Sequence, residues 1–319
     1  IEKLFSVADK LEPFASKEKI TRVLEGAILG NMFFEPSTRT RISFGASFNL
    51  LGGNVREITE VGSSSLAKGE SLADTAQVLS GYSDIIVLRH PENGSVQKFA
   101  EASRVPVINA GDGSNEHPSQ ALLDLYTIQK ELSQNKKNLD NLRIALVGDL
   151  KYGRAVHSLC KILSKYSNVK MDLVSPEELQ LPEDLLNQLT DAGVGVNQTE
   201  NLEEGISEVD IIYVTRVQEE RFNNKEDANK YRGLLSLNQS IYTANCEPNT
   251  VIMHPLPRDS RSDANELDRD LYANPNLAIF RQADNGVVIR MAMFALVLGV
   301  EDKIKKTAKS VNWKVGLSS

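Results

Sequence analysis

Residues 37–41, STRTR, place three hydroxyl side chains and two arginines in direct succession. They follow an apolar run, residues 27–34, that is typical of a buried strand. They open a helical pattern in which Ile42 and Phe48 lie on one side. A strand, a turn of small hydroxyl residues and a helix N-terminus together make an anion site, because the unpaired N–H groups and the helix dipole point at the ligand.

A structural role for these residues is the alternative. Ser37 could act only as the helix N-cap, and Arg39 and Arg41 could be solvated helix arginines. Two arginines in the first helical turn, however, oppose the positive end of the helix dipole, so a negative group should offset them. We therefore expect a phosphate or a carboxylate to bind at this helix start.

Further arginines follow other predicted strands. Open α/β sheets bind ligands at the carboxyl ends of their strands, and the guanidinium fork matches carboxylate and phosphate oxygens. The predicted ligand is therefore small and multiply anionic. The Gly-rich loop 111–120 could also cradle an anion, whereas the loop 63–70 taken alone is typical of a surface turn. The arginines at predicted strand ends are Arg39, Arg41, Arg89, Arg154, Arg216 and Arg258.

The composition favours a soluble enzyme. The 319 residues carry a net charge of −7, from 36 basic and 43 acidic residues, which argues against a general nucleic-acid binder. No apolar run reaches transmembrane length, so we expect no membrane partner. The two cysteines, Cys160 and Cys246, form no CxxC pair. We therefore expect no metal site and no disulfide, and a cytoplasmic location.

Apolar runs of strand length alternate with helical stripes, which predicts an α/β fold of parallel sheets covered by helices. The charged segment 131–141 is the best domain boundary. We predict two domains of similar size with the active site in the cleft between them. One is 1–134, with a C-terminal helix 285–302 packing back on it; the other is 135–284, and 303–319 is a partly disordered tail. The predicted strands are 27–34, 85–88, 105–109, 142–147, 169–174, 211–215, 251–253 and 278–280.

The chain resembles the aspartate/ornithine carbamoyltransferase family over most of its length. Both branches of the family share the STRTR element and an HPxQ element. The ornithine branch usually carries a cysteine in a His-Cys-Leu-Pro motif, where this chain has HPLP at 254–257, and that difference favours aspartate. The matching segments, in order, are FFEPSTRTRISF, SLAKGESLADT, LRHPENG, NAGDGSNEHPSQALLDLYTI, VGDLKYGRAVHSL, YVTRVQEER and MHPLPR.

The resemblance implies that carbamoyl phosphate and L-aspartate give N-carbamoyl-L-aspartate and phosphate, an early step of pyrimidine synthesis, without a cofactor. It implies a homotrimer with shared sites, and it leaves open a separate regulatory chain or a pyrimidine-pathway partner. Carbamoyl phosphate would contact Ser37, Thr38, Arg39, Thr40, Arg89, His117 and Gln120. Aspartate would contact Lys68, Arg154, Arg216, Gln218 and Leu256. The catalytic residues would be Arg39, Thr40, Lys68, Arg89 and His117, with Lys68 and Ser65 (or Ser64) supplied by a neighbouring subunit.

Two other functions stay open at this point. The chain could be a transcarbamylase for another amino acid such as ornithine, or a non-catalytic scaffold of a pyrimidine-pathway complex. Joint retention of Arg39, Lys68, Arg89 and His117 argues against the scaffold. A further hypothesis concerns Glu35, an acid beside the anion site, which could pair with Arg154 or Arg221 and stabilise a closed form.

Overall fold

The computed structural model describes residues 1–59, 69–113, 115–222 and 224–311. The chain forms two compact units. Unit 1 comprises residues 1–119 and 285–319, and unit 2 comprises residues 120–284. The sequence places the first boundary after residue 134, whereas these units divide near the start of helix α5 (Pro118–Gln134) rather than at its end.

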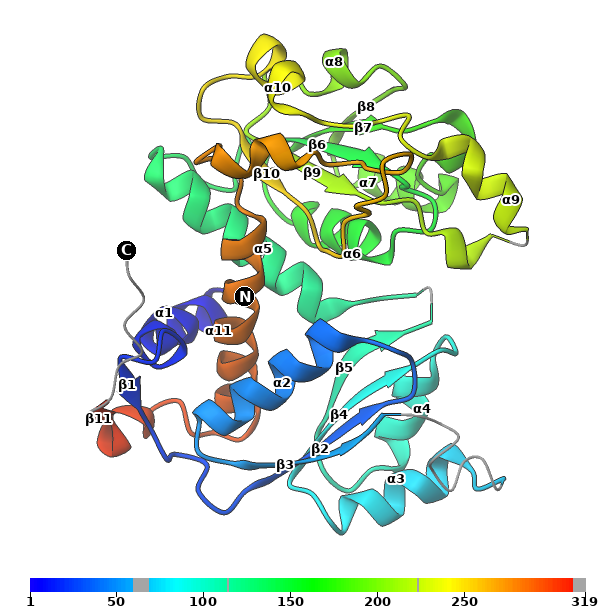
Figure 1. The fold of residues 1–319 in the computed structure, drawn as a ribbon. Helices are drawn as coiled ribbons and strands as arrows, with labels where there is room; N and C mark the ends of the chain where they lie inside the picture. The colour runs from blue at the N-terminus through cyan, green and yellow to red at the C-terminus, as the bar shows by residue number, and fades with distance from the viewer. Residues whose placement is uncertain (60–68, 114, 223, 312–319) are drawn as a thin grey trace. The chain divides into compact units, whose positions relative to one another are not determined.

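Unit 1 contains a four-stranded parallel sheet with the strand order β3–β2–β4–β5. Helices cover both faces (Figure 1). Met32 of β2 packs into an apolar cluster with α3 and α4, whereas the adjacent Asn31 bonds to the backbone of α2. The strands are β2 (Ile28–Phe33), β3 (Asn54–Ile58), β4 (Ile85–His90) and β5 (Val107–Asp112), and the helices are α1 (Glu2–Ala15), α2 (Thr38–Leu50), α3 (Leu72–Ser80) and α4 (Ser95–Ala102).

Helix α11 (Ile279–Val297) starts in unit 2 and continues into unit 1. Within unit 1, Phe294 of this helix makes edge-to-face contacts with Phe44 and Phe48 of α2. The Ser47 hydroxyl donates to the Val287 carbonyl at 3.0 Å. These contacts fix α2, whose first residues carry the predicted anion site.

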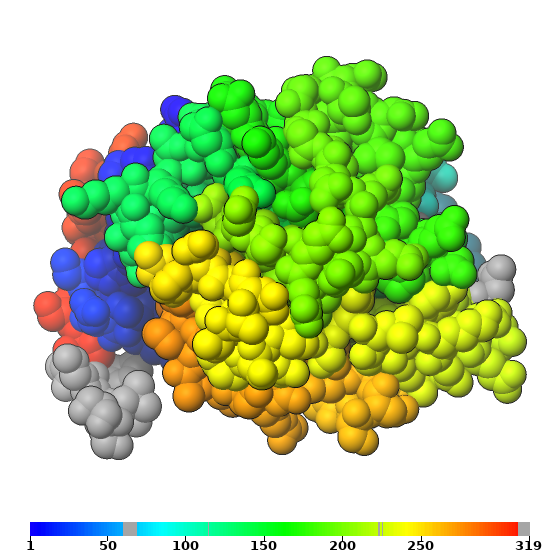
Figure 2. Space-filling model, turned by 90° about the horizontal axis from the view of Figure 1, so that it is seen from above, coloured from blue at the N-terminus to red at the C-terminus, as the bar shows by residue number. Residues whose placement is uncertain are grey.

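Unit 2 contains a five-stranded parallel sheet with the strand order β10–β9–β6–β7–β8. Its inner strands β6 and β9 are buried over almost their whole length, as expected when both faces of a sheet are covered. The surface of this unit includes the segment around α10, drawn in yellow (Figure 2). The strands are β6 (Arg143–Gly148), β7 (Lys170–Val174), β8 (Gly195–Thr199), β9 (Ile211–Thr215) and β10 (Val251–Met253). The other helices are α6 (Arg154–Leu163), α7 (Glu183–Asp191), α8 (Leu202–Gly205), α9 (Lys225–Ala228) and α10 (Gln239–Asn245).

Three expectations differ from the structure, and a fourth, on the C-terminal tail, is tested only in part. Residues 278–280 were expected to form a strand, which is wrong, because they lead into helix α11. The edge strands β3 and β8 are missing from the prediction, since their exposed, polar residues lack an apolar run. Ile42, expected on the apolar side of α2, is 54% exposed. The tail is ordered in part, because β11 (Lys309–Ser310) pairs with β1 (Lys19–Ile20); residues 312–319 lie outside the described range.

Candidate active site

Helix α2 begins at Thr38, and Ser37 is its N-cap residue with extended backbone. The Ser37 hydroxyl makes no capping hydrogen bond, and the first turn holds no acidic residue. Ser37 is therefore the N-cap by position, but its hydroxyl does not cap the helix. The helix start combines a positive dipole end with arginine side chains, so it favours an anionic ligand.

The two arginines of this turn differ in their surroundings. Arg41 forms an ion pair with Glu57 of β3, with 2.6 Å between Nη1 and Oε2. Asn31 of β2 donates to the Arg41 carbonyl at 3.1 Å and to Glu57 Oε1 at 2.7 Å. Arg41 therefore anchors α2 to the sheet, whereas Arg39 is exposed at the helix start beside the buried Thr40.

Arg89 lies near the end of β4, the neighbour of β2, and His117 lies beyond the end of β5. Arg89 is paired in register with Phe33, and its carbonyl accepts from the Phe34 N–H at 2.9 Å. His117 follows β5, the neighbour of β4, and both side chains are buried. The carboxyl ends of β2, β4 and β5 therefore gather the hydroxyl turn, a guanidinium and an imidazole on one edge of the unit 1 sheet.

Glu35 lies within the same edge. Its Oε2 accepts from Arg89 Nε at 3.0 Å, and both side chains are largely buried. A charge-assisted bond of this kind orients the Arg89 guanidinium. The predicted pairing of Glu35 with Arg154 or Arg221 stays a prediction.

Asp149 joins two loops at the carboxyl edge of the unit 2 sheet. The preceding Gly148 has φ +115°, and a Cβ there would lie 2.1 Å from the Thr215 carbonyl oxygen, so only glycine fits. The fully buried Asp149 carboxylate accepts from the N–H groups of Tyr152 and Gln218, each at 2.9 Å. Burial raises the pKa of this carboxyl, while the backbone donors oppose the shift. Asp149 thus fixes the loop before α6 and the loop after β9 together.

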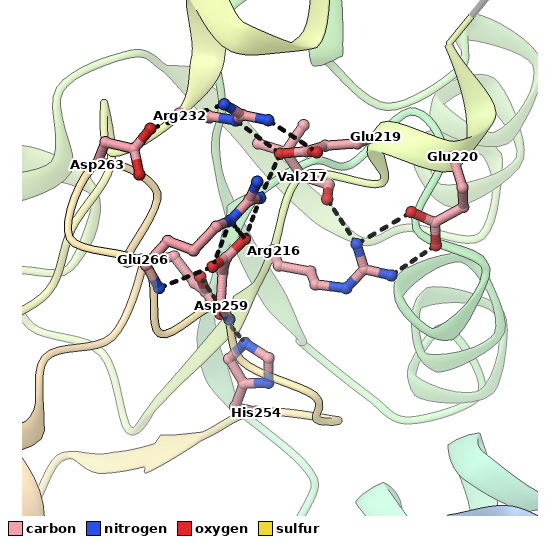
Figure 3. Close-up of polar contacts among 10 residues, drawn as sticks. Arg216, Val217, Glu219, Glu220, Arg232, His254, Asp259, Asp263 and Glu266 are labelled. Carbon is pink, nitrogen blue, oxygen red and sulfur yellow. Dashed lines mark hydrogen bonds and ion pairs between the residues drawn. The ribbon is translucent and has the colours of Figure 1, made fainter. Parts of the chain in front are cut away.

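Arg216 follows β9 and is held in a defined orientation. Its Nη1 and Nη2 atoms bind the two carboxylate oxygens of Glu220, and Nη1 also donates to the Val217 carbonyl at 2.9 Å (Figure 3). The neighbouring Glu219 instead accepts from Arg232 at 2.7 and 3.0 Å. Glu220 therefore orients Arg216, whereas Glu219 fixes the loop after β9 through its bonds to Arg232.

The residues 254–257, here called the Leu256 turn, follow β10. Leu256 has φ +56°, and the Leu256–Pro257 peptide bond is cis. The buried His254 accepts the Leu256 N–H at Nδ1, 2.8 Å away, and its Nε2 lies 2.8 Å from Glu266 Oε1 (Figure 3). Nε2 therefore carries a proton and donates to Glu266. Burial lowers the pKa of this histidine.

The other residues predicted for the site lie at helix starts, after β10 or outside the described range. Arg154 is the first residue of α6, and Gln120 lies in the first turn of α5. Arg258, at a predicted strand end, has a structural role, because it donates to the Leu267 carbonyl at 2.7 Å and stacks over the Tyr272 ring. The predicted residues Ser64, Ser65 and Lys68 lie outside the described range.

Among the described residues, no group of three or more potential ligand side chains could hold a metal ion. Over the same ranges, no helix is long and apolar enough to cross a membrane. Burial raises the pKa of Cys160 to about 12 and that of Cys246 to about 11, so both thiols stay protonated at neutral pH.

Comparison with known proteins decides the family. Residues 1–130 match the family model for the aspartate/ornithine carbamoyltransferase carbamoyl-P binding domain, and residues 140–297 match the Asp/Orn binding domain. The chain belongs to this carbamoyltransferase family. The first domain match contains the hydroxyl turn, Arg89 and His117, and the second contains Arg154, Arg216 and the Leu256 turn.

Members of the carbamoyltransferase family resemble the chain over nearly its whole length. The aspartate carbamoyltransferase catalytic subunit of Saccharophagus degradans is 66% identical over 98% of this chain and 93% of its own. The catalytic subunit of M. jannaschii aspartate transcarbamoylase is 43% identical with a TM-score of 0.84, over 93% and 94% of the two chains. Aspartate transcarbamoylase from Trypanosoma cruzi, solved with carbamoyl phosphate and aspartate, is 36% identical with a TM-score of 0.82, over 93% and 91%.

Sequence reasoning missed two acids of this family member. Asp149 stands directly after a buried strand, and an acid at a strand end could have identified it as a site residue from the sequence. Glu220 gave no signal, because its role depends on the bend of the chain that returns it to Arg216.

Proposed function

We propose that this chain is the catalytic chain of an aspartate carbamoyltransferase. The enzyme transfers the carbamoyl group of carbamoyl phosphate to the amine of L-aspartate and releases phosphate. One observation carries the proposal: polar and cationic groups gather at the carboxyl edge of each sheet, in a chain whose family transfers carbamoyl groups.

Unit 1 would bind carbamoyl phosphate. The phosphate would accept from the helix start at residues 37–40 and from the Arg39 guanidinium. Thr40, Arg89 and His117 would surround the carbamoyl oxygen. Gln120, the first residue of unit 2, would contact the carbamoyl nitrogen. The absence of acid from the first turn of α2 supports an anionic ligand there.

Unit 2 would bind aspartate. Arg154 and Arg216 carry guanidinium groups suited to the two carboxylates of this substrate, and Gln218 would add a further contact. The orientation of Arg216 by Glu220 supports this role, because a fixed guanidinium binds a carboxylate at a lower cost in side-chain entropy. The Leu256 backbone would line the same site.

The reaction needs no covalent intermediate with the enzyme. The aspartate amine attacks the carbamoyl carbon, so a C–N bond forms while the C–O bond to phosphate breaks, and the departing phosphate takes the proton. Negative charge builds on the carbamoyl oxygen after the amine attacks and before the C–O bond breaks. Donors fixed at Thr40, Arg89 and His117 stabilise that charge, and alignment of the two substrates contributes much of the remaining acceleration.

Steady-state product formation tests the acceptor. With carbamoyl phosphate present, we expect turnover with L-aspartate and at least about 100-fold lower kcat/KM with L-ornithine, because a cationic side chain would face the arginines meant for a carboxylate. Faster turnover of ornithine would establish the other branch of the family. Absence of turnover with any amino acid from pure, folded protein would favour a scaffold.

We further propose a homotrimer in which Lys68 and Ser65 of one subunit complete the site of its neighbour. Chains carrying Lys68→Ala and chains carrying Arg39→Ala should each be nearly inactive. Mixing them should restore activity, because some sites then combine an intact Arg39 with an intact Lys68. Size analysis should give three chains per particle. No recovery after confirmed subunit exchange would refute shared sites.

We also propose that the enzyme catalyses an early step of pyrimidine synthesis and that it acts in the cytoplasm. Both statements stay predictions, as does a separate regulatory chain or a pyrimidine-pathway partner.

A further inference from the structure

A buried carboxylate lies at the centre of a hydrogen-bond network inside unit 2. Asp124 of α5 is fully buried. Its Oδ1 accepts from Gln120 Nε2 at 2.9 Å and from Gln282 Nε2 at 2.6 Å, and its Oδ2 accepts from the Tyr213 hydroxyl at 2.7 Å. These donors come from elements far apart in the sequence, so the network forms only in the folded unit.

The same network reaches the Leu256 turn. Gln282 Oε1 accepts from the His254 N–H at 2.9 Å. The His254 imidazole in turn accepts from the Leu256 N–H, and Glu266 fixes the tautomer from the other side. A continuous path of hydrogen bonds therefore connects Gln120 with Leu256, and its intermediate side chains are almost inaccessible to solvent.

The network determines which polar group Gln120 presents. Asp124 Oδ1 accepts from Gln120 Nε2, so the Gln120 amide turns its NH₂ toward Asp124. Its carbonyl oxygen Oε1 is then directed away from Asp124, as an acceptor. The Leu256 N–H is likewise engaged by His254, which leaves the carbonyl as the group that this turn can offer to a ligand.

Two acceptors suit a ligand group that carries two N–H donors. We propose that Asp124 is a positioning residue that fixes Gln120 as an acceptor for the carbamoyl NH₂, and that the site thereby discriminates carbamoyl from acyl groups that lack N–H. This inference rests on the proposed function, because it takes Gln120 as the contact of the carbamoyl nitrogen. Asparagine at position 124 could offer its own NH₂ to Gln120 and permit the reversed amide.

Calorimetric binding of carbamoyl phosphate and acetyl phosphate tests this role. Acetyl phosphate carries a methyl group in place of the NH₂. It can therefore make the phosphate contacts, but it has no N–H group to donate to Gln120 or to the Leu256 carbonyl. We expect Asp124→Asn to reduce the preference for carbamoyl phosphate over acetyl phosphate about 10-fold, the effect of one hydrogen bond. Tyr213→Phe, which removes one donor to the same carboxylate, should reduce the preference less and provides the test if Asp124→Asn does not fold.

Thr250→Val is the matched control. Thr250 is buried in the same unit and donates to the Val209 carbonyl at 2.7 Å, away from Gln120. This variant should lose stability without changing the preference. Equal weakening of both ligands in folded Asp124→Asn or Tyr213→Phe would overturn the positioning role while leaving the proposed function intact. A wild-type chain that binds neither compound would contradict the proposed function itself.

Discussion

Arg39→Ala should lower kcat/KM by about 10²–10³-fold, as does removal of a single preorganised donor from an oxyanion site. Arg39 is exposed at the start of α2, next to the Ser37 hydroxyl that makes no capping bond. Its guanidinium would bind the phosphate and stabilise the negative charge that develops during transfer. The loss should appear in initial rates of carbamoyl aspartate formation, with an unchanged melting temperature.

Arg41→Ala is the matched control, since it removes an arginine from the same turn. Arg41 pairs with Glu57, so this variant should lose stability by about 1 kcal/mol while kcat/KM changes by at most a few-fold. Equal losses of activity in the two variants would mean that the turn needs positive charge in general. That result would contradict a specific role for Arg39.

Arg216→Ala should raise the KM for aspartate about 100-fold. Two charge-assisted hydrogen bonds to a carboxylate would be lost, at about 1.5 kcal/mol or more each. The KM for carbamoyl phosphate should change far less, because the contacts proposed for that substrate lie elsewhere. Initial rates measured over a matrix of both substrate concentrations separate the two constants.

Arg143→Gln controls for the loss of an arginine–glutamate pair. Arg143 begins β6 and pairs with Glu208 at 2.9 Å, at the opposite end of the strands from Arg216. This variant should leave both KM values within about twofold, since exposed ion pairs contribute little. An unchanged aspartate KM in Arg216→Ala would show that Arg216 does not bind aspartate.

The sequence was sufficient to predict the α/β class and most of the strands. Strands such as 211–215 and 251–253 are buried on both faces, and parallel strands of that kind appear as continuous apolar runs. The edge strands β3 and β8 were missed because residues such as Arg56 and Asn197 face solvent, unlike the residues of the edge strand β10. The start of α11 was mistaken for a strand because three apolar residues at a helix start cannot be told from a strand by pattern alone.

The candidate site could be predicted only in part. The strand-end arginines look equivalent in the sequence, but Arg41 and Arg258 are committed to Glu57 and the Leu267 carbonyl. Such partners are set by tertiary structure, so local pattern cannot reveal them. The network of Asp124 is the extreme case, since Gln282 lies 158 residues away along the chain.

Isotope labelling gives the most direct test of the proposed transfer. The enzyme would be mixed with carbamoyl phosphate labelled with ¹³C and L-aspartate labelled with ¹⁵N, and the products followed by NMR. We expect a ¹³C carbamoyl signal split by a directly bonded ¹⁵N, with phosphate released in equal amount. Release of phosphate without the coupled signal would mean that the chain hydrolyses carbamoyl phosphate and does not transfer its carbamoyl group to aspartate.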